Sequence, residues 1–127
     1  GSSIGNSLYE REGSMNNFEE RVAMELGTSS NIEFWHRNLE RGKGFYINGF
    51  KANHYPDFIM RTKSGKIILV ETKGDHLDNA DSAAKCRLGI EWEKQAGNNF
   101  AYFMIFDKKE VDGAYTLDKA KELISQM

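Results

Sequence analysis

The 127-residue chain has one cysteine, Cys86, and one proline, Pro56. A single cysteine excludes an intramolecular disulfide framework and any zinc site built from several cysteines. No apolar run approaches the roughly 18 residues of a transmembrane helix, so the sequence predicts no membrane span. No signal peptide precedes the first helix, and Gly1-Ser2 is typical of a cloning remnant. We therefore expect a cytoplasmic protein, in which one free thiol is unremarkable.

Composition favours one folded domain. Hydrophobic residues make up 39% of the chain and aromatic residues 12%, which is enough for a packed interior and excludes a disordered chain. A chain of this length corresponds to a single domain. Residues 1–14 are rich in Ser, Asn, Gly and Glu, and we expect them to be flexible. The sequence thus predicts a flexible segment over 1–14 and one domain over 15–127.

The charge is small overall but unevenly distributed. The net charge of −2 excludes a globally basic protein that coats DNA. Residues 37–73 carry 8 basic and 3 acidic side chains, a net +5, whereas residues 1–36 and 74–127 are net −4 and −3. This basic segment is either an ordinary solvated surface or a face that meets a polyanion.

Hydrophobic periodicity and turn residues predict an α/β fold. Helices are expected over 16–27, with an apolar stripe that ends at Gly27, over 82–95, and after the capping residue Thr116. Strands are expected over 31–37, 45–47, 58–61, 66–72 and 100–106. Residues 67–70 are all apolar, which is typical of a central strand. The predicted fold is therefore a mixed β-sheet flanked by helices.

Charged residues end the predicted central strand. Glu71 and Lys73 lie two residues apart, so both point to one face of the sheet. If residues 63–65 form a three-residue turn with Gly65 in the left-handed conformation, Asp57 pairs with Glu71 across the hairpin. Two carboxylates side by side repel each other unless a cation lies between them, and hard oxygen ligands suit Mg²⁺ or Mn²⁺. Lys73 would then face the same point.

Two other interpretations of this strand end stay open. A shift of one residue in the hairpin register would place Phe58 opposite Glu71 and separate the two acids. Glu71 and Lys73 are also compatible with an ordinary ion pair where the strand leaves the core, in an unrelated α/β domain.

The residues around this hairpin resemble a known superfamily. Pro56-Asp57, thirteen intervening residues and Glu71-Thr72-Lys73 are similar to the PD-(D/E)xK nuclease signature. The flanking blocks resemble the C-terminal endonuclease region of type III restriction-enzyme subunits and related helicase-nucleases. These blocks are Phe34-Trp35-His36-Arg37-Asn38, residues 44–50, residues 54–58 and residues 70–77, within a similarity that covers roughly 15–106.

The resemblance implies a restriction-endonuclease-like sheet and Mg²⁺-dependent hydrolysis of DNA, with Mn²⁺ as a substitute metal. Asp57 and Glu71 would be metal ligands and Lys73 the catalytic lysine. No Walker loop is present, so an ATP-dependent helicase or translocase region would lie elsewhere in a longer bacterial polypeptide, together with a modification subunit. The alternative is a non-catalytic nucleic-acid-binding or docking module of the same fold.

Further residues are candidates for the site. The first helix of this family often supplies another acid, and the apolar stripe favours Glu19 over Glu20 as a third metal ligand, although both remain compatible with surface charges. Each histidine is a possible base, phosphate donor or structural residue. Trp35, Tyr46 and Trp92 lie on apolar stripes, which favours a core position over base stacking. Candidates for supporting the site or contacting DNA are His36, Arg37, His54, His76, Lys85 and Gln95.

Overall fold

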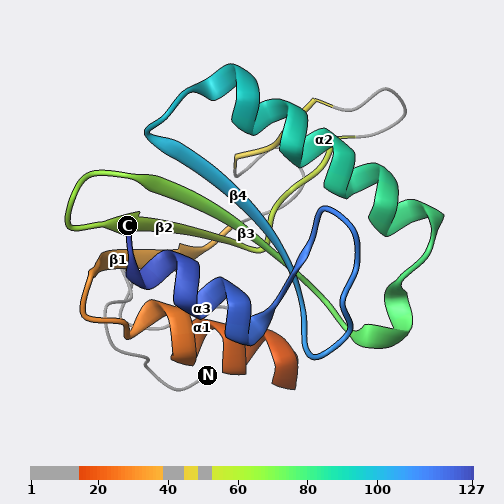
Figure 1. Ribbon diagram of the computed structural model, residues 1–127, viewed down its shortest axis with the longest axis horizontal. Coiled ribbons are helices and arrows are strands. Elements are labelled where there is room, and N and C mark those ends of the chain that lie inside the picture. Colours follow the sequence, from red (N-terminus) through yellow and green to blue (C-terminus); the bar gives the residue numbers. More distant parts are fainter. Residues whose placement is uncertain (1–14, 39–44, 49–52) are drawn as a thin grey trace.

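The computed structural model describes residues 15–38, 45–48 and 53–127 (Figure 1). The predicted flexible segment 1–14 lies outside the described residues. Within the described residues, no helix is long and apolar enough to cross a membrane. The elements in chain order are α1 (Asn17–Gly27), β1 (Ile32–Arg37), β2 (Phe58–Thr62), β3 (Ile67–Lys73), the 3₁₀ turn η1 (Asp75–Leu77), α2 (Ala80–Ala96), β4 (Phe100–Phe106), β5 (Tyr115–Thr116) and α3 (Leu117–Ser125).

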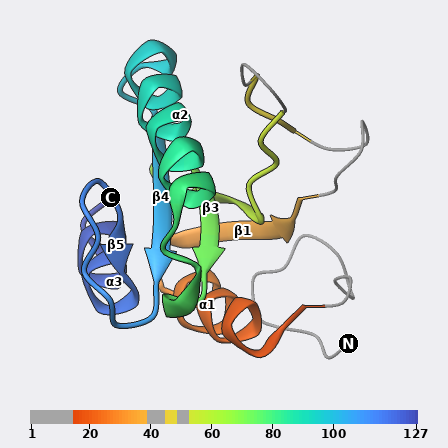
Figure 2. The same ribbon diagram turned by 90° about the vertical axis from the view of Figure 1, so that its right-hand side faces the viewer.

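The strands form one mixed sheet in the order β1-β2-β3-β4-β5. β1, β2 and β3 pair antiparallel, whereas β4 pairs parallel with both β3 and β5. The helices cover both faces: α1 and α3 pack on one, and α2 packs on the other (Figure 1). Turned by 90°, the same layers are seen with the sheet between α2 and α1 (Figure 2). The predicted mixed sheet flanked by helices is therefore confirmed.

Each face of the sheet has its own apolar core. Residues of α1 and α3 pack on alternate positions of the strands, including Trp35, Phe58 and Val70. The opposite face buries Leu69, Tyr102 and Phe106 against α2. This alternation follows from the two-residue period of a strand. It places odd-numbered residues of β3 on the α2 face of the sheet.

α2 lies close to β4 because Gly89 has no side chain at their contact. A Cβ atom at this position would lie 2.2 Å from Cε1 of Tyr102, far inside van der Waals distance. Glycine thus lets the helix backbone approach the ring, and the α2 face of the sheet is closed directly over Tyr102.

The hairpin between β2 and β3 has the predicted register. Gly65 adopts a φ of +97°, and its N–H donates to the Thr62 carbonyl at 2.9 Å. Ile59 pairs with Leu69, and Phe58 pairs with Val70. The alternative register, with Phe58 opposite Glu71, is therefore excluded.

The predicted strand over 45–47 is wrong. Among the described residues this segment forms a single antiparallel bridge, between Ile47 and His54, whose backbone groups exchange two hydrogen bonds of 2.8 Å. The backbone of Phe45 bonds a side chain instead of a strand: its N–H donates to Oδ1 of Asn38 at 3.0 Å, and its carbonyl accepts from Nδ2 at 2.6 Å. A buried asparagine that satisfies both groups removes the need for a neighbouring strand.

Candidate active site

Asp57 and Glu71 lie side by side at one end of the hairpin. The register that pairs Phe58 with Val70 places Asp57 opposite Glu71 one position further along. Directly opposed residues of an antiparallel pair have neighbouring side chains. Lys73 follows two positions after Glu71 and shares its face, the one covered by α2. The hairpin therefore brings together the three residues predicted to perform catalysis.

Asp57 is held in place at both its backbone and its side chain. Its Oδ2 accepts hydrogen bonds from the backbone N–H and from Oγ1 of Thr72, both at 2.7 Å. Its carbonyl accepts from the backbone N–H of Asn38 at 2.8 Å. A carboxylate with this many donors is fixed in orientation before any ligand arrives.

Glu71 has one carboxylate oxygen that is not satisfied. Glu71 is 5% exposed, and its Oε2 lies 3.7 Å from Nζ of Lys73. Its Oε1 is buried and has no hydrogen-bond partner among the described residues. Because an unpartnered buried charged group is costly, this oxygen indicates a position where another group belongs.

Electrostatics around the two acids favour a cation. Burial raises the pKa of Glu71 well above its ordinary value and the Asp57 charge raises it further, while Lys73 and Lys85 oppose the shift. Burial also raises the pKa of Asp57, although the hydrogen bonds from Thr72 lower it. A positive ion between two neighbouring carboxylates stabilises their ionised forms and so opposes the rise in their pKa values.

Glu19 is buried, as the apolar stripe of α1 predicts, but both of its oxygens have partners. Oε1 accepts from the backbone N–H of Asn16, which completes the capping box of α1. Oε2 lies 3.0 Å from Nη1 of Arg37. Glu19 raises and Arg37 lowers the pKa of Asp57, so this ion pair lies near the site. Glu19 thus acts as a helix cap and as the partner of Arg37.

His54 and Lys85 approach the same face. Nε2 of His54 lies 2.7 Å from the hydroxyl of Tyr102, and burial, with help from Lys85 and Lys73, lowers the pKa of His54 to about 4. Lys85 forms an ion pair with Asp81 at 3.4 Å, and its charge also acts on Glu71. His54 is thus a neutral structural residue beneath the site, whereas Lys85 is a cation beside it.

The other three candidates differ in position. His36 of β1 pairs with Ile59 of β2, so it lies on the α2 face of the sheet. His76 is exposed in η1, and within the described part of the chain it forms no hydrogen bond or ion pair with the two acids. Gln95 lies ten residues beyond Lys85 on α2, about 15 Å along the helix, and bonds Glu91 instead. Among the described residues Gln95 thus makes no contact with the two acids, and its role in supporting the site or contacting DNA stays a prediction.

Two important residues of the site do not follow from the motif spacing. Thr72 points to the α1 face by strand alternation, yet its hydroxyl and N–H bind Asp57. Asn38 joins Asp57 to Phe45. An asparagine at the end of a strand can form such hydrogen bonds, but the sequence does not show which residues it contacts, because these depend on the tertiary fold.

The donor set fits a hard divalent cation in part. Among the described residues there is no group of three or more His, Cys, Asp or Glu side chains arranged to hold a metal. Asp57 and Glu71 provide two carboxylates, and Glu71 Oε1 has no other partner. Mg²⁺ commonly binds through one or two carboxylates and keeps several of its waters, so two acids are sufficient for such a site.

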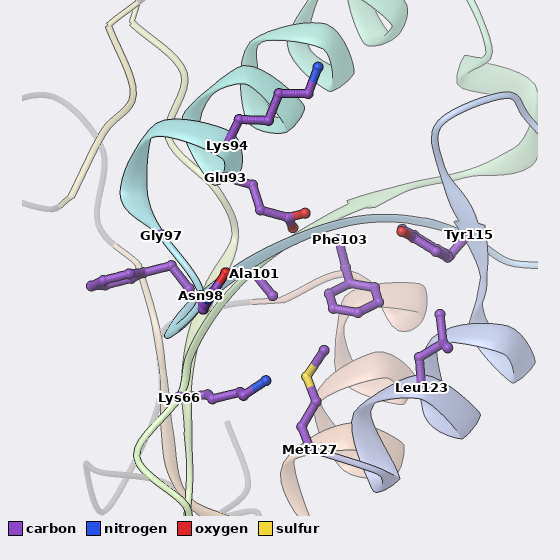
Figure 3. Close-up of a pocket in the computed structure, with 11 residues that line it drawn as sticks. Lys66, Glu93, Lys94, Gly97, Asn98, Ala101, Phe103, Tyr115, Leu123 and Met127 are labelled. Atoms are coloured by element: carbon purple, nitrogen blue, oxygen red, sulfur yellow. The ribbon is translucent and has the colours of Figure 1, made fainter.

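A surface hollow of about 440 Å³ lies elsewhere, at the start of β3 and the end of α2 (Figure 3). Its lining includes Lys66, Glu93 and Lys94, and neither Asp57 nor Glu71 contributes to it. Glu93 accepts a hydrogen bond of 2.6 Å from the backbone N–H of Tyr102. The Glu93 carboxylate thus satisfies a backbone N–H of β4. The hollow is separate from Asp57 and Glu71.

The site therefore consists of Asp57, just before β2, and of Glu71 and Lys73 at the end of β3. The Glu19–Arg37 ion pair and Lys85 lie near it. Comparison of the chain with protein-family models, with curated proteins and with solved structures gives no match.

Proposed function

We propose that this domain is a metal-dependent endonuclease that hydrolyses DNA phosphodiester bonds. The observation that carries the proposal is the unsatisfied Oε1 of Glu71, buried beside the carboxylate of Asp57. A divalent cation shared by the two acids would satisfy this oxygen and remove their repulsion. The sequence order Pro56-Asp57, Glu71 and Lys73 supports the same conclusion through its resemblance to PD-(D/E)xK nucleases.

An ordinary structural ion pair accounts for less of the geometry. Lys73 lies near Oε2 of Glu71 only, so Oε1 would stay buried and unpaired. Such a pair also gives no reason for Asp57 to be fixed against Glu71 by Thr72. A buried charge without a partner lowers the stability of the fold. A cation site explains both features at once.

The residues divide the chemistry between them. Asp57 and Glu71 would hold a Mg²⁺ ion, which would supply Lewis-acid polarisation of a phosphoryl oxygen and a lowered pKa for a bound water. Thr72 holds Asp57 in a fixed orientation, which reduces the cost of assembling the site. The ammonium of Lys73 shares a face with both acids and is placed to orient a water or to stabilise negative charge on a phosphate. Arg37 and Lys85 supply further positive charge for the phosphate backbone.

The wider assignment rests on the resemblance. A type III restriction-type enzyme would carry this domain on a longer bacterial, cytoplasmic polypeptide with an ATP-dependent helicase region, and would act with a modification subunit. Both strands of DNA would then be cut only where two domains meet or one acts twice.

Plasmid cleavage in Mg²⁺ or Mn²⁺ tests the proposal. We expect nicked and linear products from the wild-type protein, and loss of both when EDTA is added or when Asp57→Asn or Glu71→Gln is introduced. Glu110→Gln is the matched control, because Glu110 is an exposed acid in the loop after β4. Cleavage that survives either site substitution would overturn the assignment. DNA binding without cleavage in any divalent metal would favour the non-catalytic module.

A further inference from the structure

Five aromatic side chains form two sets of ring contacts, which meet at the consecutive residues Phe45 and Tyr46. Tyr55 contacts Tyr46 at a centroid distance of 5.4 Å, and Phe45 directly precedes Tyr46 in the chain. Phe45 contacts Trp92 of α2 at 5.9 Å, and Trp92 contacts Phe100 at 5.7 Å. We call this set the aromatic row.

Three of the five rings in the aromatic row are exposed to solvent, and Tyr55 and Trp92 are half-buried. Phe45, Tyr46 and Phe100 are 40%, 42% and 37% exposed. The sequence placed Tyr46 in the core, and the structure corrects this, because its segment is not a strand. Single exposed apolar residues are common, but contiguous ones mark a binding surface.

The row is joined to the hairpin acids. Asn38 donates its backbone N–H to the carbonyl of Asp57, while its side chain bonds both backbone groups of Phe45. Asn38 thus fixes the position of Phe45 relative to Asp57. Figure 2 shows the segment that contains Phe45 and Tyr46 standing beside α2, on the same side of the sheet as that helix.

We propose that the aromatic row binds unpaired nucleotides of the substrate by stacking their bases on its rings. This inference rests on the proposed function and extends it, because it names the form of nucleic acid that the site prefers. In a duplex each base face is covered by its neighbours, whereas in a single-stranded stretch the faces are free to stack on aromatic side chains.

Charge distinguishes a nucleic acid from an apolar protein partner. Residues 37–73 carry a net +5, and they contribute three rings of the row, Phe45, Tyr46 and Tyr55. Through Asn38 the row is joined to the strand end that carries Lys73, and the charge of Lys85 on α2 acts on the same strand end. Aromatic rings next to positive charge are the combination that binds single strands: cations hold the phosphates while the rings hold the bases.

Binding in EDTA tests the inference without cleavage. A short fluorescein-labelled single-stranded oligonucleotide of mixed sequence and its duplex are titrated with the protein, and anisotropy is recorded. We expect tighter binding of the single strand, and a loss of about five- to 150-fold in its affinity for each of Phe45→Ala and Tyr46→Ala, with duplex affinity unchanged. Met24→Ala, which removes an exposed apolar side chain of α1, is the matched control.

Conservative variants separate stacking from simple apolar contact. Tyr46→Phe keeps the flat ring and should keep wild-type affinity, whereas Phe45→Leu keeps apolar area without a ring and should lose affinity. Trp92 provides a direct signal, because the other tryptophan, Trp35, is fully buried. Single-stranded oligonucleotide should quench the Trp92 emission, and Trp92→Phe should abolish that change.

The possible outcomes keep this inference apart from the proposed function. Equal affinity for single strand and duplex, or full affinity in Phe45→Leu, would overturn base stacking while plasmid cleavage still tests the nuclease. Loss of cleavage in Asp57→Asn with stacking intact would support both. Stacking in a wild-type protein that never cleaves would support the aromatic row and refute the nuclease.

Discussion

Thr72 binds Asp57 through two groups at once, its backbone N–H and its hydroxyl, each 2.7 Å from Oδ2. The backbone bond is available to any residue at this position, but the hydroxyl bond requires threonine or serine. The pair links the end of β3 to the start of β2 at the point where the two acids meet. Thr72 therefore orients Asp57 without touching a ligand.

Replacement of this hydroxyl should weaken metal binding. We expect Thr72→Val, which keeps the shape of the side chain, to lower Mn²⁺ affinity by about tenfold, since partners that orient a ligand commonly contribute 10–100-fold. Calorimetric titration with Mn²⁺ measures the change. Thr62→Val is the control: Thr62 is buried at the other end of the hairpin, and its hydroxyl accepts from Lys66. Equal affinities in the two variants would refute a role for Thr72.

Loss of Lys73 should abolish cleavage and preserve the fold. Lys73 lies at the end of β3 beside Glu71, where we propose that its ammonium acts on water or phosphate. We expect Lys73→Ala to retain Mn²⁺ binding, because removal of a nearby cation reduces repulsion of the metal. Plasmid cleavage and circular dichroism check the two halves of this prediction. Lys63→Ala, in the turn after β2, should cut normally; a wild-type rate in Lys73→Ala would refute the catalytic role.

Duplex DNA should bind weakly and with a strong dependence on salt. The net charge of −2 gives no broad attraction, and the basic segment 37–73 offers only a local one. For two or three phosphate contacts, affinity should fall about ten- to fiftyfold between about 50 and about 200 mM salt. Anisotropy titrations at several salt concentrations measure this slope. A sequence-specific nanomolar complex at physiological salt would contradict the prediction.

The buried His54 should make the fold sensitive to acid. Its pKa is lowered from 6.5 to about 4, first by burial, so the unfolded chain takes up a proton at higher pH than the folded one. The stability that neutral His54 contributes is therefore complete above pH 6.5 and is lost as the pH falls toward 4. That loss amounts to at most about 3 kcal/mol.

His54→Gln tests this dependence. Urea unfolding of both proteins across the pH range separates the histidine from other acid-sensitive groups, because only the difference between the two curves is used. We expect the wild-type protein to lose more stability than the variant between pH 6.5 and 4. Parallel curves would show that His54 does not titrate in this range.

The parts of the molecule that follow from sequence are those set by local pattern. Gly65 fixed the hairpin register because a three-residue turn requires a left-handed residue, and Thr116 caps the last helix as expected. The apolar stripe of α1 distinguished Glu19 from Glu20. Such features depend on neighbours within a few positions of the chain.

The parts that did not follow depend on distant contacts. Phe45 was expected in a strand, but the side chain of Asn38 satisfies its backbone. The short strand β5 forms because Tyr115 and Thr116 meet the end of β4, and two residues leave no periodic pattern.

The central claim is that Asp57 and Glu71 share one divalent cation, and a crystal structure of the wild-type protein soaked with Mn²⁺ tests it most directly. The account predicts an anomalous-difference peak between the two carboxylates, with one oxygen of each at about 2.0–2.6 Å from the ion and Oε1 of Glu71 as a ligand. A map with full Mn²⁺ occupancy elsewhere, or with Lys73 or a water occupying the position beside Oε1, would contradict it.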